Sequence, residues 1–370
     1  MPPTSVCIVM AGGGTGGHLA PGLALADKLS RRLDEVRIVF LGTGRPVEDL
    51  LIRPAGWELR ASGAVRLPSG LASWPLFPFR LWRSIVRAKA ALRELAPGVV
   101  IGLGGYGSFP VVVAARRLRI PSVLLEQNSI PGKANRWLSR VAEEVYVQFE
   151  RSRGYFRHPE RVHALGNPLR RGIAEGSRER AVETFSLDVG LRTLLVLGGS
   201  QGARRINEAV CDALGELASL GVQIVHQTGA SDVDWVSARY RETGTPGHVT
   251  AFIGEMPDAL AAADLVISRA GATTLAELAA VGRAMILVPY PLAAEGHQQL
   301  NAQVFADAGA AVIVPDAQLD GARLVQLVGE LMRDDARRHA MAEAARTLAR
   351  PDATREVSER ILNLLKKRDR

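Results

Sequence analysis

The chain contains one local pattern twice: an apolar, β-branched run that ends in glycines and is followed at once by a helical period. The first copy runs from Ser5 to Met10 and continues into AGGGTGGH, and the second begins at Leu191 and reads LRTLLVLGGSQGARR. Short apolar runs that alternate with helical stretches are typical of parallel sheets buried on both faces. More such runs follow each copy, so the sequence predicts two doubly wound α/β halves. Pro168, just after a strand-like run, marks the linker between them.

Charge is distributed unevenly between the two halves. Residues 1–170 hold 24 of the 46 basic and 12 of the 38 acidic residues, which leaves 22 and 26 for the rest of a chain whose net charge is +8. A basic half favours an anionic partner such as a membrane surface or nucleic acid. No nucleic-acid-binding motif is recognisable, so we expect no nucleic acid partner.

Several classes of protein are excluded by what the sequence lacks. Two cysteines, Cys7 and Cys211, are too few for a disulfide framework or a zinc site, which fits a reducing cytosol. The N-terminal segment has no basic leader, and no run of ~18 apolar residues is present, so any membrane contact is expected to be peripheral. Asp232 and Asp234 resemble an Asp-x-Asp metal motif, but we interpret Asp232 as a helix N-cap and expect no metal and no cofactor.

The first glycine turn is a candidate anion site. Gly12, Gly14 and Gly17 satisfy G-x-G-x-x-G between a strand and a helix, a geometry that suits phosphate. A nicotinamide cofactor would also need a carboxylate at the end of the second strand, and the run from Phe40 to Gly44 has none. His18 opens the next helix, whose positive end favours neutral imidazole, so it is a candidate general base. A turn without a ligand and a packing histidine remain the alternatives.

The second half repeats this logic in three places. Ser200 lies in the glycine turn and can donate its hydroxyl to an anion. A small-residue turn with Ala272 and Thr274 then opens a helix that carries Glu277, which suits ribose hydroxyls or else simply complements the helix dipole. Further on, Gln298 and its neighbours supply amides that both donate to and accept from a hydroxyl-rich ligand.

The segment 68–95 is a candidate membrane contact. Aromatic residues are 5% of the chain, yet this segment is rich in them and in arginine. A basic face beside aromatic side chains is what an interfacial helix on anionic lipid requires, whereas a core helix with solvated arginines is the alternative. The residues expected to contact the membrane are Trp74, Phe77, Phe79, Trp82, Arg80 and Arg83.

Seven motifs in order carry a resemblance over nearly the whole chain. They are GGGTGGHLAPGLALA, GLGGYGSFP, LEQNSIPGKANRWLS, GNPLR, GGSQGARRIN, SRAGATTLAELAAVGRAMILVPYP and HQQLNA. The chain resembles the MurG family of bacterial N-acetylglucosaminyltransferases. The resemblance implies a GT-B fold, in which two Rossmann-like domains face a cleft and a C-terminal helix crosses back to the first. We expect an acceptor- and membrane-binding domain over 1–166, a UDP-GlcNAc-binding domain over 167–345 and the returning helix over 346–370.

The resemblance also implies a reaction and a location. An inverting enzyme of this family moves N-acetylglucosamine from UDP-GlcNAc to the C4 hydroxyl of lipid I, on the cytoplasmic face of the inner membrane. The soluble UDP-GlcNAc 2-epimerases, and a nucleotide-sugar binder without activity, are the alternatives. The donor residues implied are Thr15, Gly16, Gly17, Asn128, Arg170, Ser200, Ile253 (through its backbone, to uracil), Ala272, Thr274, Glu277, Gln298 and Gln299. Those implied for the acceptor diphosphate are Gly104, Gly105, Tyr106 and Ser108.

One position departs from the family pattern. The family usually carries histidine before its Glu-Gln-Asn triplet, and this chain has Leu125 there, so any role of that imidazole is absent or supplied elsewhere. The triplet itself is intact, and Glu126 is the second candidate for the general base after His18.

Overall fold

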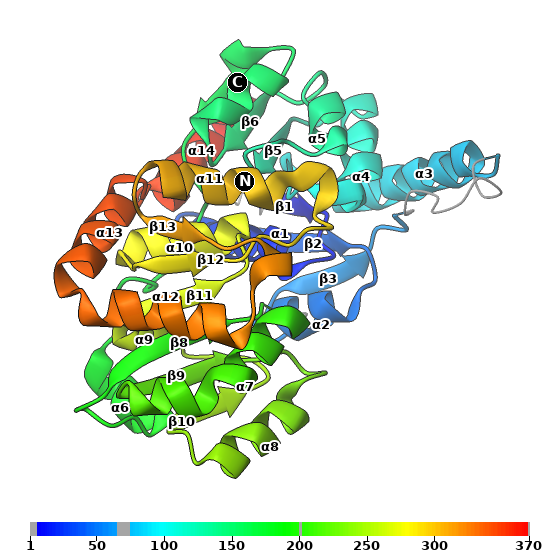
Figure 1. Ribbon diagram of the computed structural model, residues 1–370. Helices are drawn as coiled ribbons and strands as arrows, with labels where there is room; N and C mark the ends of the chain where they lie inside the picture. Colours follow the sequence, from blue (N-terminus) through cyan, green and yellow to red (C-terminus); the bar gives the residue numbers. More distant parts are fainter. Residues whose placement is uncertain (1–5, 65–74, 200–201, 369–370) are drawn as a thin grey trace. The chain divides into compact units, whose positions relative to one another are not determined.

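The computed structural model describes residues 6–64, 75–199 and 202–368, and it divides into two compact units. Unit 1 comprises the chain up to Arg170 together with the segment from Arg350 onward, and unit 2 comprises Arg171–Ala349. Each unit is built on one parallel sheet with helices on its faces (Figure 1). The predicted α/β class, with two doubly wound halves, is confirmed.

The sheet of unit 1 has the strand order β3-β2-β1-β4-β5-β6-β7, all parallel. Its strands are β1 (Val6–Ala11), β2 (Val36–Gly42), β3 (Glu58–Ala61), β4 (Val99–Gly102), β5 (Ser122–Glu126), β6 (Glu144–Val147) and β7 (Val162–Ala164). Its helices are α1 (Gly16–Ser30), α2 (Pro46–Ile52), α3 (Phe77–Leu95), α4 (Gly105–Arg117), α5 (Lys133–Leu138) and α14 (Ala353–Arg368), with short 3₁₀ helices η2 (Glu150–Tyr155) and η3 (Pro159–Arg161).

Helix α14 returns to unit 1 and packs on its sheet. Val357 and Ile361 are fully buried in one apolar cluster with residues of α1 and the central strands. Arg360 donates to Glu144 of β6 through Nε (2.7 Å) and Nη2 (3.1 Å). The Thr354 hydroxyl bonds the backbone of Leu169 at 3.0 Å. The predicted return of the C-terminal helix is therefore confirmed.

The sheet of unit 2 has the order β10-β9-β8-β11-β12-β13, again parallel. Its strands are β8 (Arg192–Leu197), β9 (Val222–Gln227), β10 (Gly247–Thr250), β11 (Leu265–Ser268), β12 (Met285–Leu287) and β13 (Ala311–Ile313). Its helices are α6 (Arg178–Phe185), α7 (Arg204–Ser219), α8 (Val233–Thr243), α9 (Met256–Ala262), α10 (Ala272–Val281), α11 (His297–Asp307), α12 (Gly321–Arg333) and α13 (Asp335–Thr347), with 3₁₀ helices η4 (Ala294–Gly296) and η5 (Asp316–Gln318).

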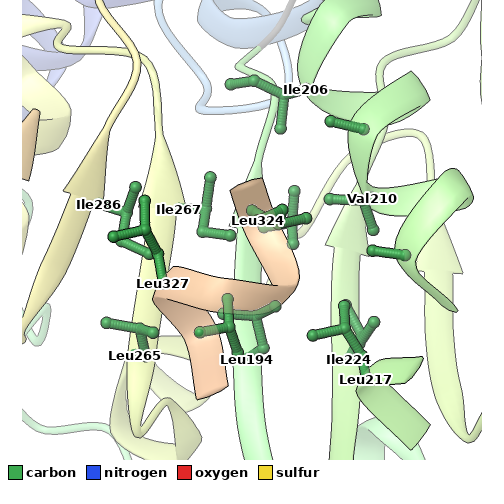
Figure 2. Close-up of a cluster of buried hydrophobic side chains, with 14 of the residues drawn as sticks. Leu194, Ile206, Val210, Leu217, Ile224, Leu265, Ile267, Ile286, Leu324 and Leu327 are labelled. Atoms are coloured by element: carbon green, nitrogen blue, oxygen red, sulfur yellow. The ribbon is translucent and has the colours of Figure 1, made fainter. Parts of the chain in front are cut away.

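The core of unit 2 forms where helices cover the sheet. Figure 2 shows Leu194, Ile224 and Ile267 from three neighbouring strands, together with Leu324 of α12 and Ile206 of α7. All five side chains are fully buried. Because both faces of a parallel sheet are covered in this way, its strands are apolar throughout, which is why they are recognisable in the sequence.

The strand orders reverse direction at one place in each sheet. In unit 1 the chain moves outward in opposite directions from β1 and β4, and in unit 2 from β8 and β11. In open α/β sheets, ligands bind outside the carboxyl ends of the strands at this reversal. The first glycine turn follows β1 and the second follows β8, so both candidate anion sites lie at such a position.

Among the helices of the described residues, none is both long enough and apolar enough to cross a bilayer.

Candidate active site

The loop that follows β1 packs tightly against the loop that follows β4. Gly12, Gly13 and Gly14 all have positive φ angles, of 109°, 148° and 87°. A Cβ atom on Gly12 would come within 2.8 Å of the Gly104 carbonyl oxygen, so no larger residue fits without moving that loop. The first loop ends at Thr15, the N-cap of α1, whose side chain makes no capping bond.

His18 lies in the first turn of α1 and faces the β4 loop. Its Nδ1 is 2.8 Å from the Thr15 hydroxyl oxygen. A Cβ atom on Gly104 would lie 2.9 Å from Cδ2 of the ring, and one on Gly105 would lie 3.8 Å from Cε1. The structure thus brings four predicted residues, Thr15, His18, Gly104 and Gly105, together at the strand-order reversal of unit 1.

The start of α4 offers backbone amides and one aromatic side chain. Gly104 is the N-cap, with φ 102°, and Gly105 has φ 70°. Tyr106 is 44% exposed in the first turn. The Ser108 side chain is fully buried and its hydroxyl donates to the Gly105 carbonyl at 2.9 Å, so its proton is engaged within this turn.

The carboxylate of Glu126 lies inside unit 1, where it is 4% exposed. It accepts hydrogen bonds from the backbone N–H groups of Asn128 and Gly132, both at 3.0 Å, and from Nδ2 of Asn135 at 2.9 Å. Burial raises the pKa of Glu126, and these donated hydrogen bonds oppose the rise. In this arrangement Glu126 holds the loop that follows β5, and its interpretation as the second candidate base stays a prediction.

The departure at Leu125 has a packing explanation. Leu125 is 2% exposed and belongs to the apolar cluster formed with α1 and α14. It lies on β5 and pairs in register with Tyr146 of β6. An isobutyl group is well suited to these neighbours. The neighbouring Asn128 is half-buried, and its Nδ2 donates to Glu126 at 3.3 Å.

Sequence reasoning missed a second buried carboxylate, Glu48 of α2, which is 1% exposed. It accepts from the N–H of Thr43 (2.8 Å), the hydroxyl of Thr43 (2.7 Å) and the N–H of Gly44 (2.8 Å). A Cβ on Gly13 would come within 2.7 Å of its Oε1. Arg45 donates to the Gly14 carbonyl at 2.7 Å. A carboxylate therefore does lie at the end of β2, but it holds the β2–α2 turn. The sequence signal that could have found it is a glutamate three residues after the N-cap position, Arg45, as in a capping box.

We predict that Glu48→Ala lowers the free energy of unfolding by about 2–4 kcal/mol. The substitution removes the charged acceptor of the half-buried Thr43 and of the Gly44 N–H, and hydrogen bonds to a charged group contribute about 1.5–3 kcal/mol each. Urea denaturation measures the loss. Asp49→Ala is the matched control, because the neighbouring carboxylate is exposed and pairs with the exposed Arg53 along the helix. Equal stability of the two variants would contradict the anchoring role of Glu48.

In unit 2 the second glycine turn meets the loop that follows β9. Gly202 has φ 76°, and a Cβ there would lie 2.5 Å from the Thr228 carbonyl oxygen. The turn ends at Ala203, the N-cap of α7, so backbone amides and the helix N-terminus converge there. Ser200, the expected diphosphate contact, lies outside the described residues.

The start of α10 follows β11, which is the neighbour of β8 in the sheet of unit 2. Gly271 is its N-cap, and Asn301 donates to the preceding carbonyl of Ala270 at 3.2 Å, which holds the turn. Ala272 is buried, whereas Thr274 and Glu277 are half-buried in the first two turns. The first turn of this helix carries small side chains.

Gln298 and Ile253 are placed differently from one another. Gln298, in the first turn of α11, accepts from the Tyr290 N–H through Oε1 at 2.9 Å, and Gln299 beside it is exposed. The Ile253 side chain is 1% exposed, so only its backbone is suited to contact a base.

A buried polar network holds the loop that follows β9, against which the glycine turn packs. His226 is fully buried, with Nδ1 3.1 Å from the Tyr240 hydroxyl and Nε2 3.1 Å from Oδ1 of Asn207. Asn207 in turn donates to the Thr228 carbonyl at 3.0 Å and to Asp232 at 2.8 Å. Asp232 is the N-cap residue of α8 as predicted, but it makes no capping bond because its carboxylate is turned to Asn207 instead. Burial lowers the pKa of His226 to about 3.

The remaining donor candidates belong to unit 1. Thr15, Gly16, Gly17 and Asn128 lie on the loops described above, and Arg170 is exposed at the end of the unit. No group of three or more His, Cys, Asp or Glu side chains with metal-binding geometry occurs among the described residues.

Helix α3 has one buried and one exposed face. Ile85, Leu92 and Leu95 pack into the core, as expected from their spacing. Phe79 and Trp82 are 56% and 55% exposed and stack with their ring centroids 6.0 Å apart. Arg80, Arg83 and Arg87 are exposed as well. The helix begins at Phe77, and Pro78 is tolerated in its first turn. Trp74 lies outside the described residues.

Comparison with known proteins gives two family matches. Residues 8–147 match the glycosyltransferase family 28 N-terminal domain, and residues 193–357 match the glycosyltransferase family 28 C-terminal domain. Two similar relatives are named UDP-N-acetylglucosamine–N-acetylmuramyl-(pentapeptide) pyrophosphoryl-undecaprenol N-acetylglucosamine transferase. That of Thermodesulfovibrio yellowstonii is 39% identical, over 98% of this chain and 99% of its own. That of Geobacter sulfurreducens is 40% identical, over 98% and 100%.

Solved structures agree in fold. The crystal structure of Acinetobacter baumannii MurG matches with a TM-score of 0.75 at 31% identity, over 97% of this chain and 99% of that one. A UDP-GlcNAc 2-epimerase from Neisseria meningitidis, bound to UDP-GlcNAc, matches with a TM-score of 0.66 at 13% identity, over 97% and 100%. At that identity the second likeness shows the fold alone.

Proposed function

Because the chain belongs to glycosyltransferase family 28, with the N-acetylglucosamine transferases that act on N-acetylmuramyl-(pentapeptide) pyrophosphoryl-undecaprenol, we propose that it makes lipid II for peptidoglycan synthesis. The reaction moves N-acetylglucosamine from UDP-GlcNAc to the C4 hydroxyl of the N-acetylmuramoyl sugar of lipid I. The observation that carries this proposal is the near-full-length identity of about 40% to proteins of that name.

The donor is proposed to bind unit 2. The amides of the glycine turn and the N-termini of α7 and α10 favour a diphosphate. Glu277, in the second turn of α10, suits the ribose hydroxyls, and Gln298 and Gln299 suit the sugar. As the bond from C1 to the phosphate oxygen breaks, its electron pair goes to UDP. Backbone amides that already point at the diphosphate stabilise that charge without having to reorganise.

The acceptor is proposed to bind unit 1. The diphosphate of lipid I would meet the amides of Gly104 and Gly105 at the N-terminus of α4, with the exposed Tyr106 beside them. The C4 hydroxyl attacks C1 of the donor sugar with inversion, and His18 takes the hydroxyl proton as the new oxygen–carbon bond forms. Its position beside Gly104 and Thr15 supports this role.

Peripheral binding to the cytoplasmic face of the inner membrane is proposed to use α3. Its exposed aromatic pair and arginines suit an anionic lipid surface.

Transfer itself is tested with radiolabelled UDP-GlcNAc and a lipid I analogue. We expect the label to move into the lipid fraction in a β-1,4 linkage. Label that remains water-soluble with lipid I present contradicts the proposal. Conversion to a 2-epimer would indicate the isomerase instead, and unchanged bound UDP-GlcNAc would indicate a binder without activity.

For the membrane contact, the double variant Phe79→Ser, Trp82→Ser is expected to bind phosphatidylglycerol vesicles about 10-fold more weakly or worse. Complete burial of an aromatic side chain contributes about 1.5–3 kcal/mol; because both rings are only about half exposed, burying the pair in lipid adds about 1.5–3 kcal/mol in total, and tenfold in affinity is about 1.4 kcal/mol. Vesicle co-sedimentation measures the change. A control with Leu50→Ser and Val189→Ser, which are 72% and 78% exposed elsewhere, should bind like the unaltered protein. Equal binding of both double variants would move the contact away from α3.

A further inference from the structure

Gln127 follows β5 directly and links the loops that follow β5 and β4. Its side chain is 3% exposed, and Nε2 donates to the carbonyl of Leu103 at 3.2 Å. A backbone carbonyl only accepts hydrogen bonds, so this contact decides which end of the amide is nitrogen. Oε1 must therefore be the other end, and it is turned away from Leu103.

Oε1 of Gln127 is buried and accepts no hydrogen bond from any residue that the structure describes. An acceptor in this condition costs free energy until a donor reaches it. The atom lies beside Gly104, where a Cβ would come within 3.5 Å of it. The same Cβ would lie 2.9 Å from Cδ2 and 3.3 Å from Nε2 of His18. Oε1 and the Nε2 edge of the imidazole thus line the same small space over Gly104.

The other side of the imidazole has different surroundings. Nδ1 is 2.8 Å from the hydroxyl oxygen of Thr15, which is exposed. A neutral imidazole carries a proton on one of its two nitrogens. A hydrogen bond donated by one nitrogen fixes the proton there and leaves the other nitrogen able to accept a proton. A buried acceptor on the Nε2 side favours a proton on Nε2, which leaves Nδ1, beside the exposed Thr15, as the base.

We propose that Gln127 is a positioning residue for His18: its Oε1 accepts a hydrogen bond from Nε2–H and so directs Nδ1 toward the hydroxyl that reacts. This rests on the proposed function. In the transfer, the O–H bond of the acceptor breaks and an N–H bond forms at Nδ1. The resulting imidazolium keeps its Nε2–H bonded to Oε1, which stabilises the charge. The arrangement resembles the way in which a third group orients the base in hydrolytic triads.

Other ionisable groups lie on the loops at the same edge of the sheet and have to be held constant in a test. They are Arg45 and Glu48 on the β2–α2 turn, which lie beside Gly14 and Gly13, Tyr106 at the start of α4 and Glu126 at the end of β5. The test therefore changes Gln127 alone and uses two substitutions with opposite expected effects on the imidazole.

The variants are Gln127→Met, which removes the acceptor, and Gln127→Glu, which makes it a carboxylate. In the unaltered protein with ¹⁵N-histidine, long-range ¹H–¹⁵N spectra should show His18 protonated at Nε2, with the signal identified by its loss in His18→Gln. In Gln127→Met we expect that tautomer to be depleted and the pKa of His18 to fall by about one unit. In Gln127→Glu the pKa should rise. The acidic limb of the kcat/KM profile should move in the same directions.

Turnover in Gln127→Met should fall by about 10–100-fold while the Kd for UDP-GlcNAc is unchanged. The matched control is Gln223→Met: Gln223 is a buried glutamine of β9 whose amide bonds Asp188 and Thr193, and its loss should affect stability without moving the His18 signals. Unmoved His18 signals in both Gln127 variants would overturn the proposal even in an active enzyme. An unaltered protein without transferase activity would overturn the proposed function, and the tautomer measurement would still decide the role of Gln127.

Discussion

Replacing His18 by alanine is expected to lower turnover by about 10²–10⁴-fold, the range that general base catalysis contributes. The side chain lies in the first turn of α1, against the backbone of Gly104 and within 2.8 Å of the Thr15 hydroxyl. Donor binding should survive, because the glycine turn and the α10 turn of unit 2 make no use of it. Initial rates with a lipid I analogue and calorimetry with UDP-GlcNAc measure the two quantities separately.

His158→Ala is the matched control for this variant. His158 also belongs to unit 1, but it precedes η3. Its Nδ1 lies 3.2 Å from a carboxylate oxygen of Glu160. Its loss should leave both turnover and donor binding unchanged. Turnover of His18→Ala near that of the control would exclude His18 as the base.

Acid is expected to destabilise the protein through His226. Burial lowers the pKa of this imidazole to about 3, whereas in the unfolded chain it is about 6.5. Folding therefore favours the neutral ring. The associated stability is fully present above pH 6.5 and is lost as the pH falls toward 3, at about 1.4 kcal/mol per pH unit. Between pH 7 and pH 5 the loss from this group is about 2 kcal/mol.

The variant His226→Phe isolates this contribution. It should be less stable than the unaltered protein at pH 8, because Asn207 and Tyr240 lose their ring partner, but its stability should fall by about 2 kcal/mol less between pH 7 and pH 5. Urea denaturation at the two pH values gives the slopes. His339→Phe, the same change at an exposed histidine of α13, should keep the slope of the unaltered protein. Parallel slopes for all three proteins would contradict a buried, neutral His226.

Much of the fold follows from local sequence signals. The strands that end at Ala11 and Leu197 are apolar on both faces, and glycines follow each of them, so strand, turn and helix could be predicted from short segments. Strands that share a parallel sheet bring their carboxyl ends to one edge. For that reason the clustering of the glycine turns with the loops near Gly104 and Gly271 was also within reach of the sequence.

Side-chain direction was not within reach. Ser108 and Glu126 are residue types that often bind ligands, yet both side chains are buried and bond groups of their own loops. The sequence did not single out Glu48 or Gln127, because a glutamate on a short helix and a glutamine after a strand are common. Most of their partners lie close in the sequence: Glu48 bonds Thr43 and Gly44, and Ser108 bonds Gly105. Whether such a side chain is buried beside those partners depends on the elements that pack over the loop, and those come together only when the sheet forms.

Family likeness shows the same division at Leu125. The sequence identifies the departure from histidine, but the reason that leucine is tolerated there is an apolar cluster to which α14, more than 200 residues further along the chain, contributes Val357 and Ile361.

By itself, the sequence determined two parallel α/β units, a glycine turn after the first strand of each, and membership of a transferase family. These follow from periodicity, from glycine conformational freedom and from ordered motifs, all of which are local along the chain. The tertiary structure alone decided which polar groups are buried and hold loops in place. The carboxylates of Glu48 and Glu126 and the hydroxyl of Ser108 are buried against groups of their own loops, whereas Gln127 bonds Leu103 of the neighbouring loop and its Oε1 accepts from no described residue. A buried polar group takes the direction in which its partners lie, and burial itself is set by the elements that pack together in the fold.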